Sequence, residues 1–296
     1  MVATVKPGRL QRFFLQEDLN FLLTNRLPRR YATLFMGWFS QIEQPLVRDL
    51  SIATWKLFAD DLQLDEAESQ TFRTLRELFI RKLKRGARTI DADVSVLTSP
   101  CDAIVGACGR VTGKQALQAK GFAYPLLDLL GNHERVARHE DGWYVTLRLK
   151  SDFYHRFHAP CDGQLRHVTY ISGDTWNVNP IALKRVEQLF CKNERAVLDL
   201  ETPMRDVALT LVPVAAILVA SMRIHGLPET LDLRYRGPNE IPCNVAFQKG
   251  DELGYFQSGS TIVVFSSGNV SLAPNIHEGA RIRMGEPLLH HLTTNG

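Results

Sequence analysis

The sequence predicts an α+β protein, with a helical N-terminal region followed by a mostly antiparallel, β-rich domain. In the first 88 residues, apolar side chains recur at spacings of three and four, as they do in amphipathic helices. From residue 89 onward, short β-branched and aromatic runs are separated by Gly, Asn and Asp, which is typical of strands and turns. We therefore divide the chain into residues 1–88 and residues 89–296.

Four amphipathic helices are expected in the first region. Aromatic and leucine side chains mark the first two, and Pro28 and Pro45 separate successive helices because proline lacks the amide hydrogen that a helix interior needs. The third helix is expected to end before the acidic residues 65–68. The fourth carries an apolar face from Leu75 to Leu83, and arginine and lysine crowd its other positions.

Several strands are expected in the second region. Residues 143–150 alternate cleanly, with Trp143, Val145, Leu147 and Leu149 on one face. Three apolar runs, at residues 207–211, 214–220 and 261–265, predict further buried strands. We find no internal repeat and no long linker, so the two regions are expected to pack against each other.

Composition and charge limit the classes of function. The chain of 296 residues is 45% hydrophobic with a net charge of +3, which is ordinary for a globular protein and argues against disorder. The first 88 residues hold 15 basic and 10 acidic residues, so the remaining 208 hold 20 and 22 of the total 35 and 32. The basic excess therefore lies on the helices, where it indicates either a solvated face or docking to an anionic membrane. Nucleic acid is the weaker interpretation, because no recognition motif accompanies the charge.

Two further observations predict the cellular setting. The longest nearly apolar stretch, residues 207–220, is shorter than the roughly 20 residues that a spanning helix needs, and the first residues lack the apolar run of a secretory signal. The five cysteines are an odd number without a C-x-x-C pair, which argues against a disulfide framework and a zinc knuckle. We therefore expect a protein that remains on the cytoplasmic side.

Two histidines are the first candidates for chemistry. His155 and His158 lie three residues apart, close to the predicted end of the strand at residues 143–150. An imidazole titrates near pH 6.5, so either histidine suits proton transfer at neutral pH. A metal site has no third ligand with supporting spacing, and we predict none. Paired histidines are also common as structural or surface groups.

Two turns complete the candidate set. Asp102 follows Ser-Pro-Cys at the entry to a strand, where an aspartate is ordinarily a turn residue. Gly259 and Ser260 precede the buried run at residues 261–265, and their plain interpretation is a hairpin turn. The chemical interpretation is that the Ser260 hydroxyl attacks the carbonyl of the preceding residue, with a histidine as base and an aspartate to orient it.

Taken together, these segments resemble the shorter, bacterial type of phosphatidylserine decarboxylase. The resemblance is carried, in the family's order, by Ser-Pro-Cys-Asp102, by the string Tyr-His-Arg-Phe-His-Ala-Pro-Cys-Asp-Gly at residues 154–163, and by Phe-Gln-Ser-Gly-Ser-Thr at residues 256–261. It covers most of the chain, including the basic helices. Ser258 stands where the family usually has Leu, and Ala103 where Gly is common, but the Gly259–Ser260 bond is present.

The resemblance implies a proenzyme that cuts itself between Gly259 and Ser260 into a β chain, residues 1–259, and an α chain, residues 260–296, which stay associated. Ser260 would become a pyruvoyl group, the covalent cofactor, with His158 as base and Asp102 orienting it. Phosphatidylserine would form a Schiff base with this group and lose carbon dioxide to give phosphatidylethanolamine. Proton delivery falls to the histidine pair, His158 foremost, with His155 assisting it or binding the substrate carboxylate. The implied catalytic residues are thus Asp102, His155, His158 and Ser260.

The resemblance also implies a peripheral enzyme on the cytoplasmic side of the cell membrane, whose basic helices meet anionic lipid ahead of the β-rich catalytic domain. The sequence leaves a homo-oligomer open. Two rival functions use the same residues. A serine hydrolase or a decarboxylase of a soluble amine would share Asp102, His158 and Ser260, and a hydrolase would keep Ser260 as serine. A catalytically silent membrane-binding module would bind vesicles and release no carbon dioxide.

Overall fold

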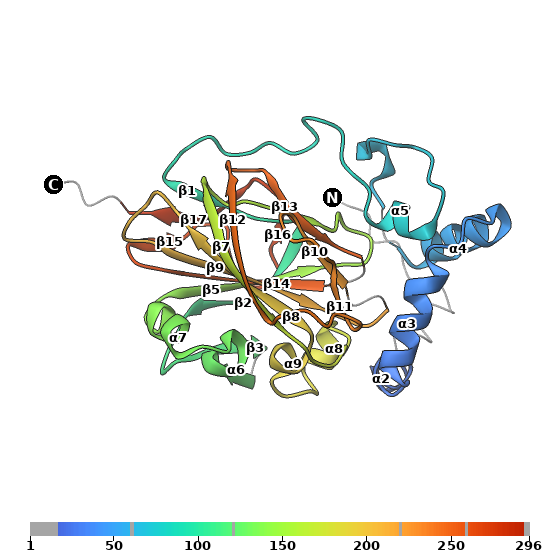
Figure 1. Ribbon diagram of the computed structural model, residues 1–296, viewed down its shortest axis with the longest axis horizontal. Helices are drawn as coiled ribbons and strands as arrows, with labels where there is room; N and C mark the ends of the chain where they lie inside the picture. Colours follow the sequence, from blue (N-terminus) through green and yellow to red (C-terminus); the bar gives the residue numbers. More distant parts are fainter. Residues whose placement is uncertain (1–16, 60–61, 120–121, 219–220, 258–259, 293–296) are drawn as a thin grey trace.

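The computed structural model describes residues 17–59, 62–119, 122–218, 221–257 and 260–292 (Figure 1). The first part of the predicted N-terminal helix and Gly259 lie outside the described residues. Within them, no helix combines the length and the apolar composition that crossing a membrane requires. All five cysteines are free thiols.

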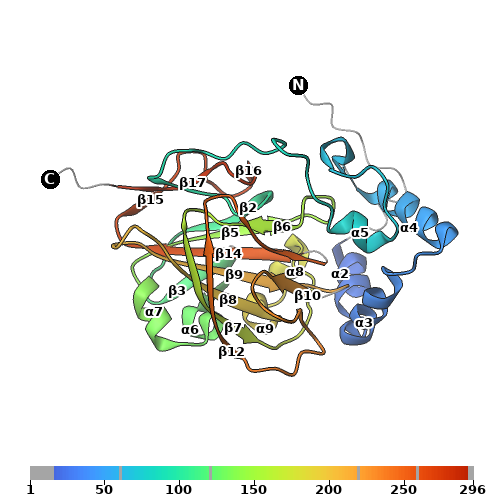
Figure 2. The same ribbon diagram turned by 45° about the horizontal axis from the view of Figure 1, so that its top comes forward.

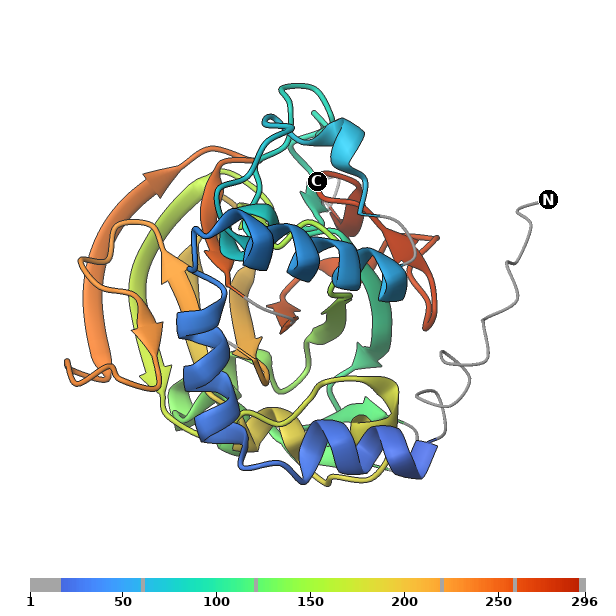
Figure 3. The same cartoon turned by 90° about the vertical axis from the view of Figure 1, so that its right-hand side faces the viewer.

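The breaks between the helices lie at the predicted prolines, but the third helix ends at Phe58, earlier than the expected end before residue 65. Helices α2 (Glu17–Asn25), α3 (Arg29–Phe39) and α4 (Pro45–Phe58) are separated at Pro28 and Pro45 as the sequence indicates. The Gln44 side chain caps α4 by accepting a hydrogen bond of 2.7 Å from the Val47 amide. A 3₁₀ turn, η1 (Leu64–Glu66), follows. Figure 3 shows α3 and α4 lying across one end of the β structure.

The predicted fourth helix is wrong in its length. Helix α5 covers only Leu75–Phe79, and the basic residues after it belong to an irregular segment. The Glu68 amide donates to the Lys82 carbonyl at 2.9 Å, and the Lys84 amide donates to the Glu66 carbonyl at 2.8 Å. Because residues 82–84 thus bond with residues 66–68, their backbone groups are used by tertiary pairing and not by a helix. The local pattern of leucines could not reveal this competitor.

A single large antiparallel sheet organises the second region. Its strands are ordered β12-β7-β8-β9-β14-β5-β2-β16. Their bounds are β2 (Ala103–Arg110), β5 (Trp143–Leu149), β7 (Gly163–Ile171), β8 (Arg195–Glu201), β9 (Ala208–Ala215), β12 (Glu240–Phe247), β14 (Ser260–Ser267) and β16 (Arg281–Ile282). The expected strand at residues 214–220 is not separate, because β9 continues through Pro213 to Ala215. The α+β class and the antiparallel pairing are confirmed.

Smaller sheets cover one face of the large sheet and short helices cover the other (Figures 1 and 2). A four-stranded sheet is ordered β11-β10-β13-β6 and a three-stranded sheet β1-β17-β15. These strands are β1 (Val96–Thr98), β6 (Arg156–His158), β10 (Ser221–Ile224), β11 (Leu231–Asp232), β13 (Glu252–Phe256), β15 (Val270–Leu272) and β17 (Pro287–His291). The remaining elements are β3 (Gln115–Ala119), β4 (Phe122–Pro125), α6 (Leu126–Leu130), α7 (His133–His139), α8 (Pro180–Leu183) and α9 (Leu189–Lys192).

The large sheet is buried on both faces. Along β14, Ile262 and Val264 join the core beneath the small sheets, whereas Val263 and Phe265 join the core beneath α6 to α9. This alternation follows from the period of two along a strand. Strand β5 behaves as predicted, since Val145, Leu147 and Leu149 share the first core. The central strand β14 is therefore fixed from both sides, and with it the position of its first residue.

Candidate active site

Ser260 is the first residue of β14, an interior strand of the large sheet. It pairs with Leu149 on β5 and with Ala215 on β9, so strands on both sides hold its backbone. The side chain is fully buried, and among the described residues its Oγ atom has no hydrogen-bond partner. It lines a cavity of about 390 Å³ together with polar groups that include Asn177 and Asn179. A buried hydroxyl without a partner is energetically unfavourable. Thr261 and Ser266 on the same strand share this property in the described structure, but of the three only Ser260 lines this cavity.

His155 follows β5 and is a neutral, buried imidazole. Its Nδ1 lies 2.9 Å from the Phe153 carbonyl, which can only accept, so Nδ1 carries the proton. The other nitrogen, Nε2, is buried without a partner among the described residues. Burial and then the charge of Arg81 lower the pKa of His155 to about 3. Its ring lies 4.0 Å from the Phe79 ring of α5, so the helical region closes over it.

His158 lies on β6 and both of its ring nitrogens have partners. Nδ1 donates to the Gly250 carbonyl at 2.8 Å, and the Tyr154 hydroxyl donates to Nε2 at 2.9 Å. Burial lowers the pKa of His158, so this imidazole is also neutral near pH 7. Its Nε2 therefore carries no proton and accepts a hydrogen bond from the Tyr154 hydroxyl.

Asp102 is buried at the entry to β2, as the sequence places it. Its carboxylate accepts hydrogen bonds from Arg88 at 2.5 to 3.1 Å and from the Met284 amide at 2.9 Å. Arg88 also donates to Glu66 at 2.7 Å. The orientation of His158 by Asp102 is therefore not a direct hydrogen bond in this structure, because Gly250 and Tyr154 occupy the two ring nitrogens.

The fold nonetheless brings the predicted segments together. The His158 amide donates to the Pro100 carbonyl at 2.8 Å, two residues before Asp102. Phe256, which lies four residues before Ser260, donates its amide hydrogen to the His155 carbonyl at 3.0 Å. Strand β13 pairs with β6 over the same stretch. In the described part of the chain, no hydrogen bond joins the Ser260 hydroxyl to either histidine.

Sequence reasoning missed two of the buried arginines of this neighbourhood. Arg81 is only 3% exposed, and it donates to the carbonyls of Leu62 at 2.7 Å and Asp152 at 3.1 Å. The side chain of Arg88 is equally buried. The sequence assigned Arg81 to a basic helix face and gave Arg88 no separate role, and nothing in the local pattern separates a buried arginine from a solvated one. Tyr154 stood inside the family string and could have been singled out there.

These groups are candidates for nucleophilic and proton-transfer chemistry on an antiparallel α+β fold. They comprise a buried hydroxyl at a strand start, two neutral imidazoles and a carboxylate held by arginine. A sequence profile of the phosphatidylserine decarboxylase family matches residues 75–290.

Individual relatives agree with this match. The chain is 34% identical over 293 residues to the phosphatidylserine decarboxylase proenzyme of Yersinia pestis (strain Pestoides F), which covers 94% of this chain and 98% of the relative. The proenzyme of Yersinia pseudotuberculosis serotype O:1b (strain IP 31758) matches to the same extent. The chain belongs to the phosphatidylserine decarboxylase family.

Proposed function

We propose that this chain is a proenzyme that matures into a decarboxylase of phosphatidylserine, releasing carbon dioxide and phosphatidylethanolamine. One observation carries the proposal beyond family membership. The Ser260 hydroxyl is buried, has no partner among the described residues, and lines a cavity at the first position of a strand that is held on both sides. A new chain end formed at this position would remain in the cavity.

Maturation uses groups of the chain itself. The Ser260 oxygen attacks the Gly259 carbonyl carbon, and the peptide C–N bond breaks to leave an ester and a free amine. Elimination then breaks the Cβ–O bond of Ser260 and frees the Gly259 carboxylate. Water replaces the nitrogen of the resulting dehydroalanine, and ammonia leaves. His158 suits the base in the first step because it is neutral, once the Tyr154 hydroxyl has turned away from Nε2.

The site fits a pyruvoyl group at residue 260, because the cavity and the unpartnered atom lie where that group would form. When present, a pyruvoyl group supplies the electrophilic carbonyl and the electron sink that decarboxylation of an amino acid headgroup needs. In this proposal His158, after accepting a proton at Nε2, returns one to the substrate carbon that loses carbon dioxide. His155 offers a bare Nε2 as an acceptor and assists proton delivery.

Surface chemistry favours a substrate held in a membrane. The large apolar side chains of α2, α3, α4 and their connections are unusually exposed, by 46% to 74%: Leu22, Leu27, Tyr31, Phe35, Trp38, Leu46, Leu50 and Leu57. Arginine and lysine lie between them in the sequence, as in helices that lie at the headgroup level of anionic bilayers. We infer a peripheral position on the cytoplasmic face of the membrane, with residues 1–88 as the membrane-facing region.

An apolar cavity adjoins both these exposed helices and the cavity of Ser260. It measures about 580 Å³ and is lined by α3, α4 and α5, with Phe39, Trp55 and Phe79 among its walls. Ser151 and Leu218 line both this cavity and the cavity of Ser260. A lipid tail in the apolar cavity would therefore leave its headgroup beside Ser260. A decarboxylase of a soluble amine would not need an apolar cavity of this size.

The first experiment is the intact mass of the purified protein under denaturing conditions. We expect two chains divided between Gly259 and Ser260, the smaller of which has lost one ammonia molecule relative to a serine terminus. The Ser260→Ala variant should remain a single chain, and Ser266→Ala, another buried hydroxyl on β14, should still divide. A single unmodified wild-type chain that cleaves esters would instead support a serine hydrolase.

The second experiment measures carbon dioxide from vesicles of phosphatidylserine and phosphatidylcholine. The wild type should release it, and release from free serine should be far slower. Trp38→Ser should lower vesicle binding and turnover together, whereas Val94→Ser, a smaller change to serine at an apolar residue that is 83% exposed outside the helices, should not. Vesicle binding without carbon dioxide would favour the silent membrane module.

A further inference from the structure

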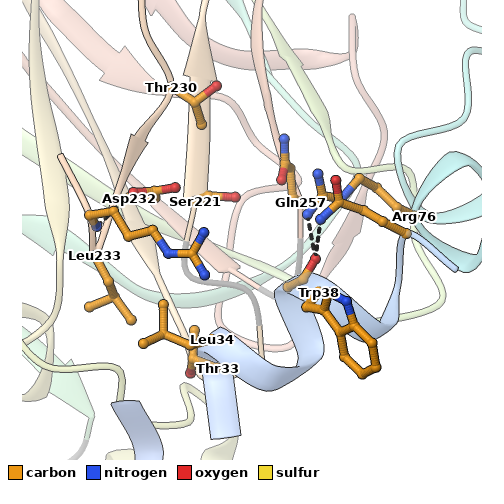
Figure 4. Close-up of a pocket in the computed structure, with 12 residues that line it drawn as sticks. Thr33, Leu34, Trp38, Arg76, Ser221, Thr230, Asp232, Leu233 and Gln257 are labelled. Atoms are coloured by element: carbon orange, nitrogen blue, oxygen red, sulfur yellow. Dashed lines mark hydrogen bonds between the residues drawn. The ribbon is translucent and has the colours of Figure 1, made fainter. Parts of the chain in front are cut away.

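A third cavity, which is polar, lies between α3 and the four-stranded sheet. It measures about 330 Å³. Figure 4 shows it between the α3 residues Thr33 and Trp38 and the strand residues Ser221 and Asp232, with Arg76 and Gln257 beside it. It shares Arg76 and Gln257 with the apolar cavity but no lining residue with the cavity of Ser260. The proposed chemistry leaves this cavity without a role.

Arg76 enters the cavity as a cation without a counter-ion. Its Nη2 donates to the Gly37 carbonyl at 2.8 Å, and its Nε is buried without a partner among the residues that the structure describes. In the described structure no carboxylate forms an ion pair with it. Burial lowers the pKa of Arg76, and the charge of Asp232 in the same cavity opposes this effect. A guanidinium in this state favours an anion as its neighbour.

Two further lining groups suit an anion. Ser221 is only 6% exposed, and its Oγ has no hydrogen-bond partner among the described residues. Arg234 supplies a second guanidinium from the segment after β11. The one acidic wall residue, Asp232, accepts a hydrogen bond of 2.7 Å from the Arg234 amide. Two arginines and one aspartate leave the cavity with a single positive charge, which matches a singly charged phosphodiester.

The position of the cavity indicates the source of that phosphodiester. Helix α3 forms one wall and carries the exposed aromatic residues Tyr31 and Phe35. Only a few bonds separate the phosphate and the amine of a serine headgroup. This cavity shares no lining residue with the cavity of Ser260, and each of the two shares residues with the apolar cavity. We therefore assign the phosphodiester here to a lipid other than the one whose amine lies at Ser260.

We propose that the cavity of Arg76, Ser221 and Arg234 binds the phosphodiester of a second anionic lipid, distinct from the lipid that is decarboxylated. The bound headgroup accepts hydrogen bonds from both guanidinium groups and from the Ser221 hydroxyl. It also contacts Gln257, three residues before Ser260. The proposal rests on the membrane contact proposed above but does not require decarboxylation.

The test uses the full-length Ser260→Ala chain and three probes in titration calorimetry: dihexanoyl phosphatidylglycerol below its micelle concentration, glycerol phosphate and inorganic phosphate. We expect the lipid to bind most tightly. Arg234→Gln should weaken it about tenfold and Ser221→Ala about threefold, the usual effects of losing a charged and a neutral hydrogen bond. Arg236→Gln, the same change on an exposed neighbour that does not line the cavity, should leave affinity unchanged.

Equal affinity in Arg234→Gln, Ser221→Ala and Arg236→Gln overturns the site. Equal affinity for inorganic phosphate and the lipid, with the same dependence on the variants, overturns the lipid as the source. If the Ser260→Ala chain shows the expected binding pattern while the wild-type protein releases no carbon dioxide from phosphatidylserine vesicles, the proposed function is refuted and this inference stands.

Discussion

The ion pair between Arg88 and Asp102 offers a direct test of the site's electrostatics through Arg88→Met. The two side chains are 3% and 5% exposed, and Arg88 bonds to both carboxylate oxygens. Methionine keeps most of the packing volume but leaves the Asp102 charge with the Met284 amide alone. Removing one partner of a buried ion pair costs about 3–5 kcal/mol, because the other charge remains in a medium that solvates it poorly.

Urea unfolding of Ser260→Ala chains measures this cost without interference from chain cleavage. Arg166→Met is the matched control, since Arg166 and Glu201 also pair at 2.5 Å but are 52% and 60% exposed. An exposed pair contributes about 0–1 kcal/mol. The double variant Arg88→Met/Asp102→Asn should recover part of the loss, because no unpaired charge stays buried. A loss at Arg88 no larger than the loss at Arg166 would refute the reasoning.

Three further predictions concern the buried groups. Since His139 and His155 have folded pKa values of about 3 against 6.5 unfolded, the unfolded chain binds more protons between these values. Stability should fall as the pH drops from about 6.5 to about 3, by up to about 1.4 kcal/mol per pH unit for each histidine, and His139→Gln should remove its share of the slope in urea titrations. Tyr154→Phe should lower the free energy of unfolding by about 1–3 kcal/mol, because it leaves a buried His158 nitrogen unpaired. It should still permit self-cleavage, observed as two chains on a denaturing gel, whereas His158→Ala should stop self-cleavage. Loss of cleavage in both would show that the Tyr154 hydroxyl itself carries the proton. Gly254→Ala should lower the unfolding temperature sharply, because its Cβ would lie 2.2 Å from the Arg223 carbonyl oxygen. The Cβ of Gly37→Ala would meet nothing within 4 Å, so this variant should stabilise α3 by about 0.5–1 kcal/mol. Equal effects of the two variants would contradict the packing.

Local patterns in the sequence determined much of the fold. Pro28 and Pro45 divide the helices because a missing amide hydrogen acts within one helical turn. The alternation along β5 reports its faces because side chains alternate over two residues. Ser260 at a strand start is likewise visible in its own neighbours. In each case the physical cause and the sequence signal lie within a few residues.

The candidate site combines both kinds of information. Family strings in the sequence contain Asp102, His155, His158 and Ser260, and their roles remain predictions. The partners of these residues come from elsewhere in the chain: Arg88 for Asp102, Gly250 for His158 and Phe79 for His155. No local pattern specifies such contacts, because they join segments that are distant in sequence.

Tertiary structure alone decided which charged and polar groups are buried. The segment after Phe79 would form a helix by its own periodicity, but bonding with residues 66–68 ends α5 there and Arg81 is buried. Removal from water underlies the three cavities and the lowered pKa values of the histidines. It also underlies the atoms of Ser260 and Arg76 that have no partner in the described parts of the chain. Desolvation is a property of the whole packed chain, so periodicity and motifs named the reacting groups but not their environment.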